Sequence, residues 1–288
     1  MPEAHALSVA TDDGVILAGA HEGDGPAVVL LHGLTGTRRY VVMGSRALER
    51  GGHRVIAYDA RGHGRSTPAP ERGGYGYARL AADLGAVLDH TGVERAVIAG
   101  ASMGAHTAVR FALEHPRRVA ALAIVTPAFD PATSAGPDEL AGWDALARGL
   151  REGGVEGFAR TYDFGRLPEQ IRATVETVVR QRLSAHEHPG AVADALEAVP
   201  RSRPFEAFSQ LAAIDVPTLV VASRDRADPS HPLAVGERYA RAIPGAELLV
   251  EEDSPAGGAG GQQISSPIAW QGGRLSRAIA GLAARVRA

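Results

Sequence analysis

Short apolar runs alternate with amphipathic segments along the first half of the chain. Short apolar stretches predict buried strands, here at Ala27–Leu31, His53–Tyr58, Ala96–Ala99 and Val119–Val125. Apolar residues three and four positions apart predict helices over roughly Tyr40–Arg50, Tyr77–Thr91 and Ala105–Leu113. Before them, Leu7–Ala10 and Val15–Ala20 are expected to form a hairpin that turns at Asp12-Asp13-Gly14. This alternation predicts right-handed crossovers and a parallel sheet.

The alternation stops near Pro127, and the pattern from there to about Ala213 is helical. Strands and helices then resume, with strands predicted at Thr218–Ser223 and Glu247–Val250 and helices at Pro232–Ile243 and from about Gln271. The sequence therefore predicts an α/β core formed by residues 1–129 and 214–288. Residues 130–213 are expected to be a helical cap inserted between the two parts.

One strand-to-helix junction carries the strongest chemical signal. An apolar run is followed by Gly100-Ala101-Ser102-Met103-Gly104 and then by an Ala-rich helical segment. Strand, Gly-x-Ser-x-Gly and helix make up the nucleophile-elbow pattern, in which a strained turn exposes the serine hydroxyl. A Cβ at Gly100 or Gly104 would collide with the neighbouring strand or helix, and the helix N-terminus favours negative charge at the turn. The pattern predicts a nucleophilic role for Ser102.

Composition excludes several other kinds of chemistry. Hydrophobic residues make up 45% of the 288-residue chain, charged residues 22%, and the formal net charge is −3, so nothing favours a nucleic-acid or anionic membrane partner. Every basic side chain is arginine and cysteine is absent, which excludes Schiff-base, Ser-Lys and thiolate mechanisms and disulfides. Neither a signal peptide nor a membrane span is recognisable, so a cytoplasmic protein is expected.

Four motifs in order resemble those of the α/β-hydrolase superfamily, in its lid-bearing esterase, lactonase and C–C hydrolase branch. They are HGLTG at His32, DARGHGRS at Asp59, GASMG at Gly100 and VASRDRADP at Val221. The resemblance implies the α/β-hydrolase fold, a mostly parallel eight-stranded sheet flanked by helices with a helical cap after the sixth strand.

The same resemblance implies roles for single residues. Ser102 matches the nucleophile, and the backbone amides of Leu34 and Met103 match the oxyanion hole. Asp225 matches the acid of the triad, in a strand-end Ala-Ser-Arg-Asp that replaces the family's usual Gly-x-x-Asp.

The chain departs from the family pattern at the catalytic histidine. The family places it in the loop after the last strand, but the last histidine of this chain is His231. The missing imidazole would fall at about Gly261 or Gln262, where a substituted histidine is expected to raise esterase turnover. We predict that Ser254–Ser266 forms a flexible loop at the mouth of the cleft, and that no imidazole contacts Ser102 Oγ.

Other residues stay open as substitutes. A surrogate base could come from the histidines nearest the site or in the cap, namely His231, His106, His186 and His188. Asp130 is the alternative to Asp225 as the acid, whereas Asp228 is interpreted as a turn former or helix N-cap. The remaining polar candidates are given structural or solvent-exposed roles: His32, His63, Glu251, Glu252 and Asp253.

Two functions from different classes follow. The first is a serine hydrolase that acts through Ser102 on a small, mostly apolar ester, lactone or related acyl compound, with an incomplete or atypical triad. The second is a relative of the same fold that binds a small ligand or assists a non-hydrolytic reaction without an acyl-enzyme. No cofactor and no metal site are expected, the partner is a small molecule, and the oligomeric state, a homodimer included, is left open.

Overall fold

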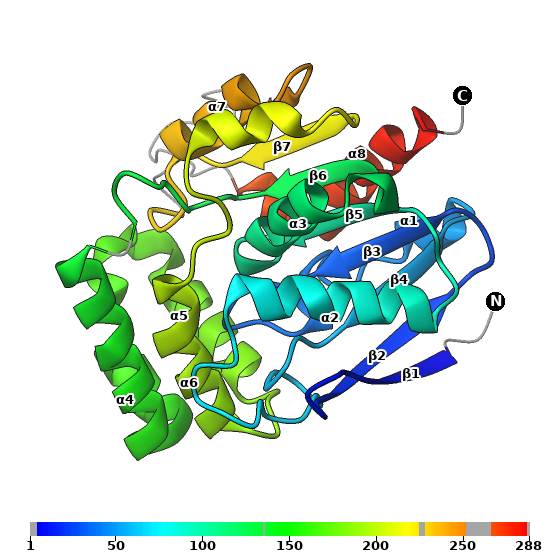
Figure 1. Cartoon of the computed structure of the whole chain (residues 1–288). Coiled ribbons are helices and arrows are strands. Elements are labelled where there is room, and N and C mark those ends of the chain that lie inside the picture. The colour runs from blue at the N-terminus through cyan, green and yellow to red at the C-terminus, as the bar shows by residue number, and fades with distance from the viewer. Residues whose placement is uncertain (1–4, 135, 225–227, 252–265, 287–288) are drawn as a thin grey trace.

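The computed structural model describes residues 5–134, 136–224, 228–251 and 266–286. Within these residues eight strands form one sheet in the order β1-β2-β4-β3-β5-β6-β7-β8 (Figure 1). The strands are β1 (His5–Ala10), β2 (Ile16–Glu22), β3 (Ala27–Leu31), β4 (Arg54–Tyr58), β5 (Ala96–Ala101), β6 (Val119–Val125), β7 (Thr218–Ala222) and β8 (Glu247–Val250). β2 pairs antiparallel with β1 and β4, and the other neighbours are parallel, which confirms the mostly parallel eight-stranded sheet.

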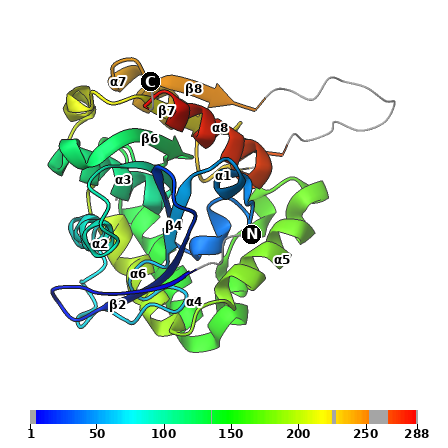
Figure 2. The ribbon, with the colours of Figure 1, turned by 90° about the vertical axis from the view of Figure 1, so that its right-hand side faces the viewer.

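Helices cover both faces of this sheet (Figure 2). The α-helices are α1 (Ala47–Arg50), α2 (Tyr77–His90), α3 (Met103–Glu114), α4 (Pro137–Thr161), α5 (Glu169–Leu183), α6 (Pro189–Ala198), α7 (Leu233–Ala242) and α8 (Gly272–Ala284). Short 3-10 turns lie between them, at Arg38–Tyr40, Pro116–Arg118, Phe164–Arg166, Val199–Arg201, Phe208–Ala213 and Ile268–Trp270.

The central strands are apolar on both sides because their alternate residues enter two different cores. In β3, Val29 and Leu31 join the cluster that contains residues of α2, α3 and α7, whereas Val28 and Leu30 join the cluster that contains residues of α1 and α8. Alternation of side chains along a strand requires this division. It explains why these strands are continuous apolar runs in the sequence.

Helices α4, α5 and α6 lie between β6 and β7 in the chain and gather at the end of the sheet toward which the parallel strands point (Figure 1). They share a buried cluster with the loops of the core, in which Leu150, Phe158 and Leu196 join Leu34 and Met103. The cluster places these helices over the turns that follow β3 and β5. That residues 130–213 form a separate domain stays a prediction.

The helix expected over Tyr40–Arg50 is wrong over most of its length. The structure has only a 3-10 turn at Arg38–Tyr40 and the four-residue α1. Met43 and Gly44 between them have φ of 47° and 72°, a left-handed conformation that no α-helix contains. The tertiary packing decides this break, because Gly272 of α8 lies against the carbonyl of Val42 so closely that a Cβ there would overlap it.

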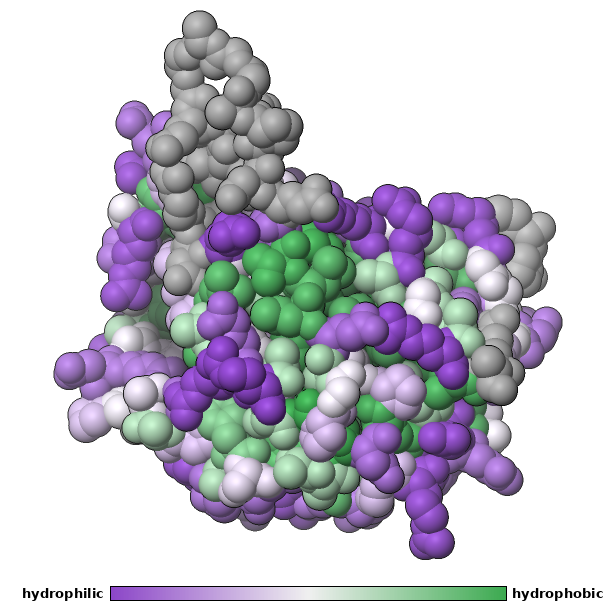
Figure 3. All heavy atoms as spheres, turned by 90° about the horizontal axis from the view of Figure 1, so that it is seen from above, coloured by the Kyte–Doolittle hydropathy of each residue, from purple (hydrophilic) through white to green (hydrophobic). Residues whose placement is uncertain are grey.

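On the face seen from above, hydrophilic side chains surround a patch of apolar atoms near the centre (Figure 3). Large apolar side chains with more than a third of their area exposed among the described residues are Ile16, Met43, Leu248 and Trp270. In the part of the chain that the structure describes, no helix is both long and apolar enough to cross a membrane.

Candidate active site

The strand-to-helix turn around Ser102 is as sharp as the Gly-x-Ser-x-Gly pattern predicts. Ser102 has φ 51° and ψ −114°, in a region that non-glycine residues rarely occupy, and α3 begins at the next residue. A Cβ on Gly100 would overlap the carbonyl of Gly104, and one on Gly104 would overlap the carbonyl of Leu31. The two glycines therefore allow the strand and the helix to approach closely enough to expose the serine.

An imidazole lies directly against this serine. His231 Nε2 is 3.0 Å from Ser102 Oγ, although the two residues are 129 positions apart in the chain. His231 Nδ1 is 2.8 Å from Asp228 Oδ1, so Nδ1–H donates to the carboxylate and Nε2 is left to accept from the serine hydroxyl. Serine, histidine and acid stand in the order and at the distances that proton transfer from the hydroxyl requires.

The prediction that no imidazole contacts Ser102 Oγ is therefore wrong. The acid and the histidine come from one turn between β7 and α7, closed by a 3.1 Å bond from the His231 N–H to the Asp228 carbonyl oxygen. In the family pattern the two come from separate loops. The sequence signal that could have predicted this pair was the spacing Asp-x-x-His shortly after a strand. Asp228 can form the turn and still bond His231 through its carboxylate.

Several calls on neighbouring segments fall on residues that are not described. Asp225, expected as the acid, lies outside the described residues. So do positions 254–265 of the expected flexible loop, with Gly261 and Gln262 among them, and also Glu252 and Asp253. These expectations stay predictions.

The other candidate acids and bases have different partners. The Asp130 carboxylate pairs with Arg238 and accepts the Ala132 N–H at 2.9 Å. Glu251 is buried and accepts the Arg224 N–H. His188 is the residue before α6, where its carbonyl accepts from the first turn of the helix. The structure brings none of these side chains to Ser102.

Leu34 and Met103 flank Ser102, as their expected roles require. Met103 is the first residue of α3, and the backbone at Gly33 passes so near that a Cβ there would lie 3.4 Å from Ser102 Cβ. In the described part of the chain neither the Leu34 nor the Met103 amide donates to a protein acceptor. That these two N–H groups form an oxyanion hole stays a prediction.

Buried histidines hold the loop that carries Leu34. His32 Nδ1–H donates to the Gly33 carbonyl, and its Nε2 accepts the Ala60 N–H at 2.9 Å. His63 Nε2 lies 2.7 Å from the Leu34 carbonyl oxygen, to which it donates. The structural roles expected for His32 and His63 agree with these contacts.

His186, in the segment after α5, also bonds to the loop that carries Leu34. Its Nδ1 accepts the Gly64 N–H at 2.8 Å, and its Nε2–H donates to the Thr35 carbonyl oxygen at 3.2 Å. Burial, followed by the charge of His63, lowers the pKa of His186 to about 3. A proton added to Nδ1 would face the Gly64 N–H and break that bond.

Protonation of His186 should therefore couple stability to pH. The unfolded histidine takes up a proton near pH 6.5 and the folded one does not, so the free energy of unfolding falls as the pH drops below 6.5. In His186→Gln, the amide can accept from the Gly64 N–H and donate to the Thr35 carbonyl. Between pH 7 and pH 5 we expect the free energy of unfolding of this variant to fall by about 2 kcal/mol less than that of the wild type. Urea unfolding of both proteins at the two pH values measures this. Equal losses would contradict it.

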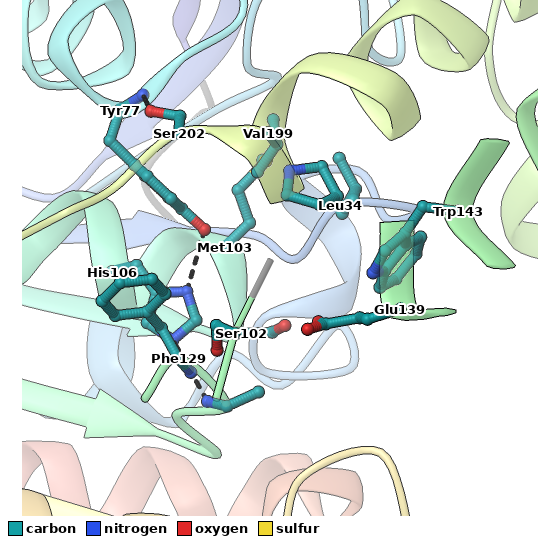
Figure 4. A pocket seen from close by; sticks show the side chains of 13 residues that line it. Leu34, Tyr77, Ser102, Met103, His106, Phe129, Glu139, Trp143, Val199 and Ser202 are labelled. Atoms are coloured by element: carbon teal, nitrogen blue, oxygen red, sulfur yellow. Dashed lines mark hydrogen bonds between the residues drawn. The ribbon is translucent and has the colours of Figure 1, made fainter. Parts of the chain in front are cut away.

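A pocket opens beside Ser102 between the core loops and the helical segment after β6 (Figure 4). Its empty volume, including the open solvent at its mouth, is about 490 Å³. Its lining comes from five parts of the chain: Leu34; Tyr77; Ser102, Met103 and His106; Ala128 and Phe129; and Ser134, Glu139, Trp143, Val199, Pro200 and Ser202 from the helical segment. Figure 4 shows the Glu139 carboxylate directed toward Ser102.

His106, one of the candidate bases, lies in the wall of this pocket but is already engaged. Its Nε2 accepts the N–H groups of Ala128 and Phe129, both at 3.1 Å, and its Nδ1 is 2.9 Å from the Tyr77 hydroxyl. Burial, followed by the charge of His231, lowers the pKa of His106 to about 3. Among the described residues, no three His, Cys, Asp or Glu side chains are grouped so that they could hold a metal ion.

Comparisons with known proteins agree with this architecture. Residues 26–256 match the family model described as alpha/beta hydrolase fold. The chain is 34% identical over 231 residues to 2-hydroxy-6-oxononadienedioate/2-hydroxy-6-oxononatrienedioate hydrolase 2 of Pseudomonas putida, covering 77% of this chain and 78% of that protein. The structure matches a thermophilic esterase from Thermogutta terrifontis with a TM-score of 0.78, 27% identity and coverage of 99% and 100% of the two chains.

A third comparison is to an enzyme described as degrading N-acyl homoserine lactones. Its TM-score is 0.72 and its identity 26%, with 96% of this chain and 99% of that chain covered. The family match spans more than half of the chain, and the sheet order, the strained Ser102 turn and the helices after β6 agree with it. The chain belongs to the α/β-hydrolase superfamily.

Proposed function

We propose that the protein is a serine hydrolase of small, uncharged esters or lactones, with a triad formed by Ser102, His231 and Asp228. The 3.0 Å approach of His231 Nε2 to Ser102 Oγ carries the proposal. Ser102 Oγ attacks the substrate carbonyl carbon while His231 Nε2 takes the hydroxyl proton. Asp228 stabilises the imidazolium, and the backbone N–H groups of Leu34 and Met103 donate hydrogen bonds to the developing oxyanion.

The second half of the reaction uses the same groups. His231 returns the proton to the leaving alcohol oxygen as the C–O bond breaks, which leaves the acyl group on Ser102. Water then attacks the acyl carbon, with His231 as the base, and releases the acid. The alternative of a non-hydrolytic binding protein was based on a missing histidine, and the position of His231 removes that reason.

The lining of the pocket supports an uncharged substrate. Apart from Glu139, none of the residues that line it in the described chain is charged at neutral pH, and no arginine is among them. The Pseudomonas putida relative is named for dioate substrates, which are dicarboxylates. Glu139 would repel a second carboxylate in this pocket, so we assign this chain neutral esters and lactones, as the names of the Thermogutta esterase and the lactone-degrading enzyme suggest.

A matched pair of esters tests both parts of the proposal. p-Nitrophenyl hexanoate and p-nitrophenyl hydrogen adipate have acyl chains of the same length, but the adipate ends in a carboxylate. We expect hydrolysis of the hexanoate with kcat/KM about tenfold higher, since like charges in a partly desolvated pocket repel by about 1.4 kcal/mol. Ser102→Ala is the control, and a fluorophosphonate probe should label Ser102 only in the wild type.

Two results would contradict different parts of the proposed function. Unlabelled Ser102, or equal activity in Ser102→Ala, would remove the serine-hydrolase mechanism. A preference for the adipate, with labelling intact, would leave the mechanism but exclude the neutral substrate class.

A further inference from the structure

The hydrogen bonds of His106 determine where the proton of the Tyr77 hydroxyl points. Two backbone N–H groups, those of Ala128 and Phe129, meet at His106 Nε2, which must therefore accept. A neutral imidazole then carries its proton on Nδ1, and Nδ1–H donates to the Tyr77 oxygen at 2.9 Å. The hydroxyl proton of Tyr77 is not used in this bond.

Tyr77 is fixed in place as well as oriented. It is the first residue of α2, its N–H donates to Ser202 Oγ at 2.8 Å, and only 5% of its surface is exposed. Within the described residues, the hydrogen-bond partner of the Tyr77 hydroxyl is His106 Nδ1–H, which donates to it, so the hydroxyl proton has no protein acceptor there. The same hydroxyl belongs to the pocket wall, together with Ser102 and Met103 (Figure 4).

We propose that Tyr77 is a specificity-determining residue that donates a hydrogen bond to an oxygen atom on the acyl part of the substrate. The inference rests on the proposed function and narrows its substrate class to uncharged esters or lactones whose acyl chain carries a ketone, ether or hydroxyl oxygen. His106 is the positioning residue, because it accepts from the backbone and so forces Tyr77 to act as a donor toward the pocket.

The balance of donors and acceptors gives the physical reason. A fully apolar acyl chain would leave the buried Tyr77 O–H without an acceptor, whereas an acyl oxygen satisfies it. Sites built to bond a polar group of the substrate discriminate strongly against the analogue that lacks it. Neutral His106 keeps this donor available across the working pH range, since its lowered pKa prevents protonation there.

Tyr77→Phe separates this role from a merely structural one. We expect it to lower kcat/KM about tenfold for p-nitrophenyl 4-oxopentanoate or 5-oxohexanoate, the cost of one lost neutral hydrogen bond. The loss for the matched pentanoate and hexanoate should be smaller, so the ratio of kcat/KM for oxo esters to that for alkyl esters should fall. The ratio between oxo and alkyl esters is the readout, because a general loss of folding would lower both equally.

A measurement on the wild type covers the case in which the variant does not fold. The preference of the enzyme for an oxo ester over its alkyl partner should exceed, by about tenfold, the ratio of their rates with hydroxide. If the wild type hydrolyses the hexanoate through Ser102 but does not prefer the oxo esters over their alkyl partners, the Tyr77 inference is wrong and the proposed function stands. If no ester is hydrolysed through Ser102, the proposed function itself fails.

Discussion

His231→Ala is expected to lower kcat/KM for p-nitrophenyl hexanoate by a factor on the order of 10³ to 10⁶. His231 is the group within bonding distance of Ser102 Oγ, at 3.0 Å, so its loss leaves a neutral hydroxyl without a base. Removal of the triad histidine in serine proteases has effects at the upper end of this range. The oxyanion donors remain, so some activity above the rate in water should persist.

The acid is tested by a pair of variants in the same segment. Asp228→Asn should lower kcat/KM about 10³- to 10⁴-fold, because the amide no longer stabilises the imidazolium and can hold the wrong tautomer. Asp225→Asn should change it less than threefold if Asp228 is the acid. His90→Ala, at the exposed C-terminal end of α2, is the control for loss of a histidine far from the site.

Three outcomes would contradict the triad of Ser102, His231 and Asp228. A large loss in Asp225→Asn with little effect in Asp228→Asn would return the acid to the position that the family resemblance implies. A tenfold or greater gain on Gly261→His or Gln262→His in the wild type would show that the base is missing and that His231 does not supply it. Activity that survives His231→Ala within threefold would have the same meaning.

Arg61→Met is expected to lower the free energy of unfolding by about 3–5 kcal/mol. The Arg61 side chain is fully buried and holds the Asp83 carboxylate through two bonds, of 2.8 and 2.6 Å. It also bonds Asp13 at 2.8 Å and the Gly74 carbonyl at 2.9 Å. Methionine fills similar space but leaves the 1% exposed Asp83 with no opposing charge in a medium of low dielectric constant.

Arg180→Met is the matched control, because Arg180 also pairs with two carboxylates. Those partners, Glu156 and Glu176, lie on the surface, and exposed pairs contribute only about 0–1 kcal/mol. Adding Asp83→Leu to Arg61→Met removes the stranded charge and should restore part of the loss. Chemical denaturation measures all four proteins. Equal effects of the Arg61 and Arg180 variants, or no recovery in the double variant, would show that burial of the charge is not the cause.

The sequence predicted the parts of this protein that depend on short-range pattern. The strands at Ala27–Leu31 and Val119–Val125 follow from apolar runs that both faces of a covered sheet require. The turn at Ser102 follows from two glycines at the positions where a Cβ would overlap a backbone carbonyl. The apolar runs and the Gly-x-Ser-x-Gly spacing each lie within a short stretch of chain, and for that reason residue type and spacing were sufficient to predict these features.

Where the apolar period was the only signal, tertiary contacts overrode it. The expected helix at Tyr40–Arg50 is interrupted at Met43 and Gly44, since α8 packs against the Val42 carbonyl at this point. Helical periodicity is a preference of the local chain, and the segment that breaks it lies more than two hundred positions later. No pattern within the predicted helix records that contact.

The histidine that contacts Ser102 also separates what the sequence predicted from what only the tertiary structure decided. The sequence by itself predicted a nucleophilic role for Ser102 and the fold around it, and it showed that the place where the family resemblance puts the histidine contains none. Only the tertiary structure decided that a turn 129 positions away brings His231 to the hydroxyl and Asp228 to His231. The tautomer of His106, and with it the orientation of Tyr77, likewise depends on amides that follow β6. Hydrogen bonds between distant segments are fixed by how the layers pack, which residue type and spacing do not encode.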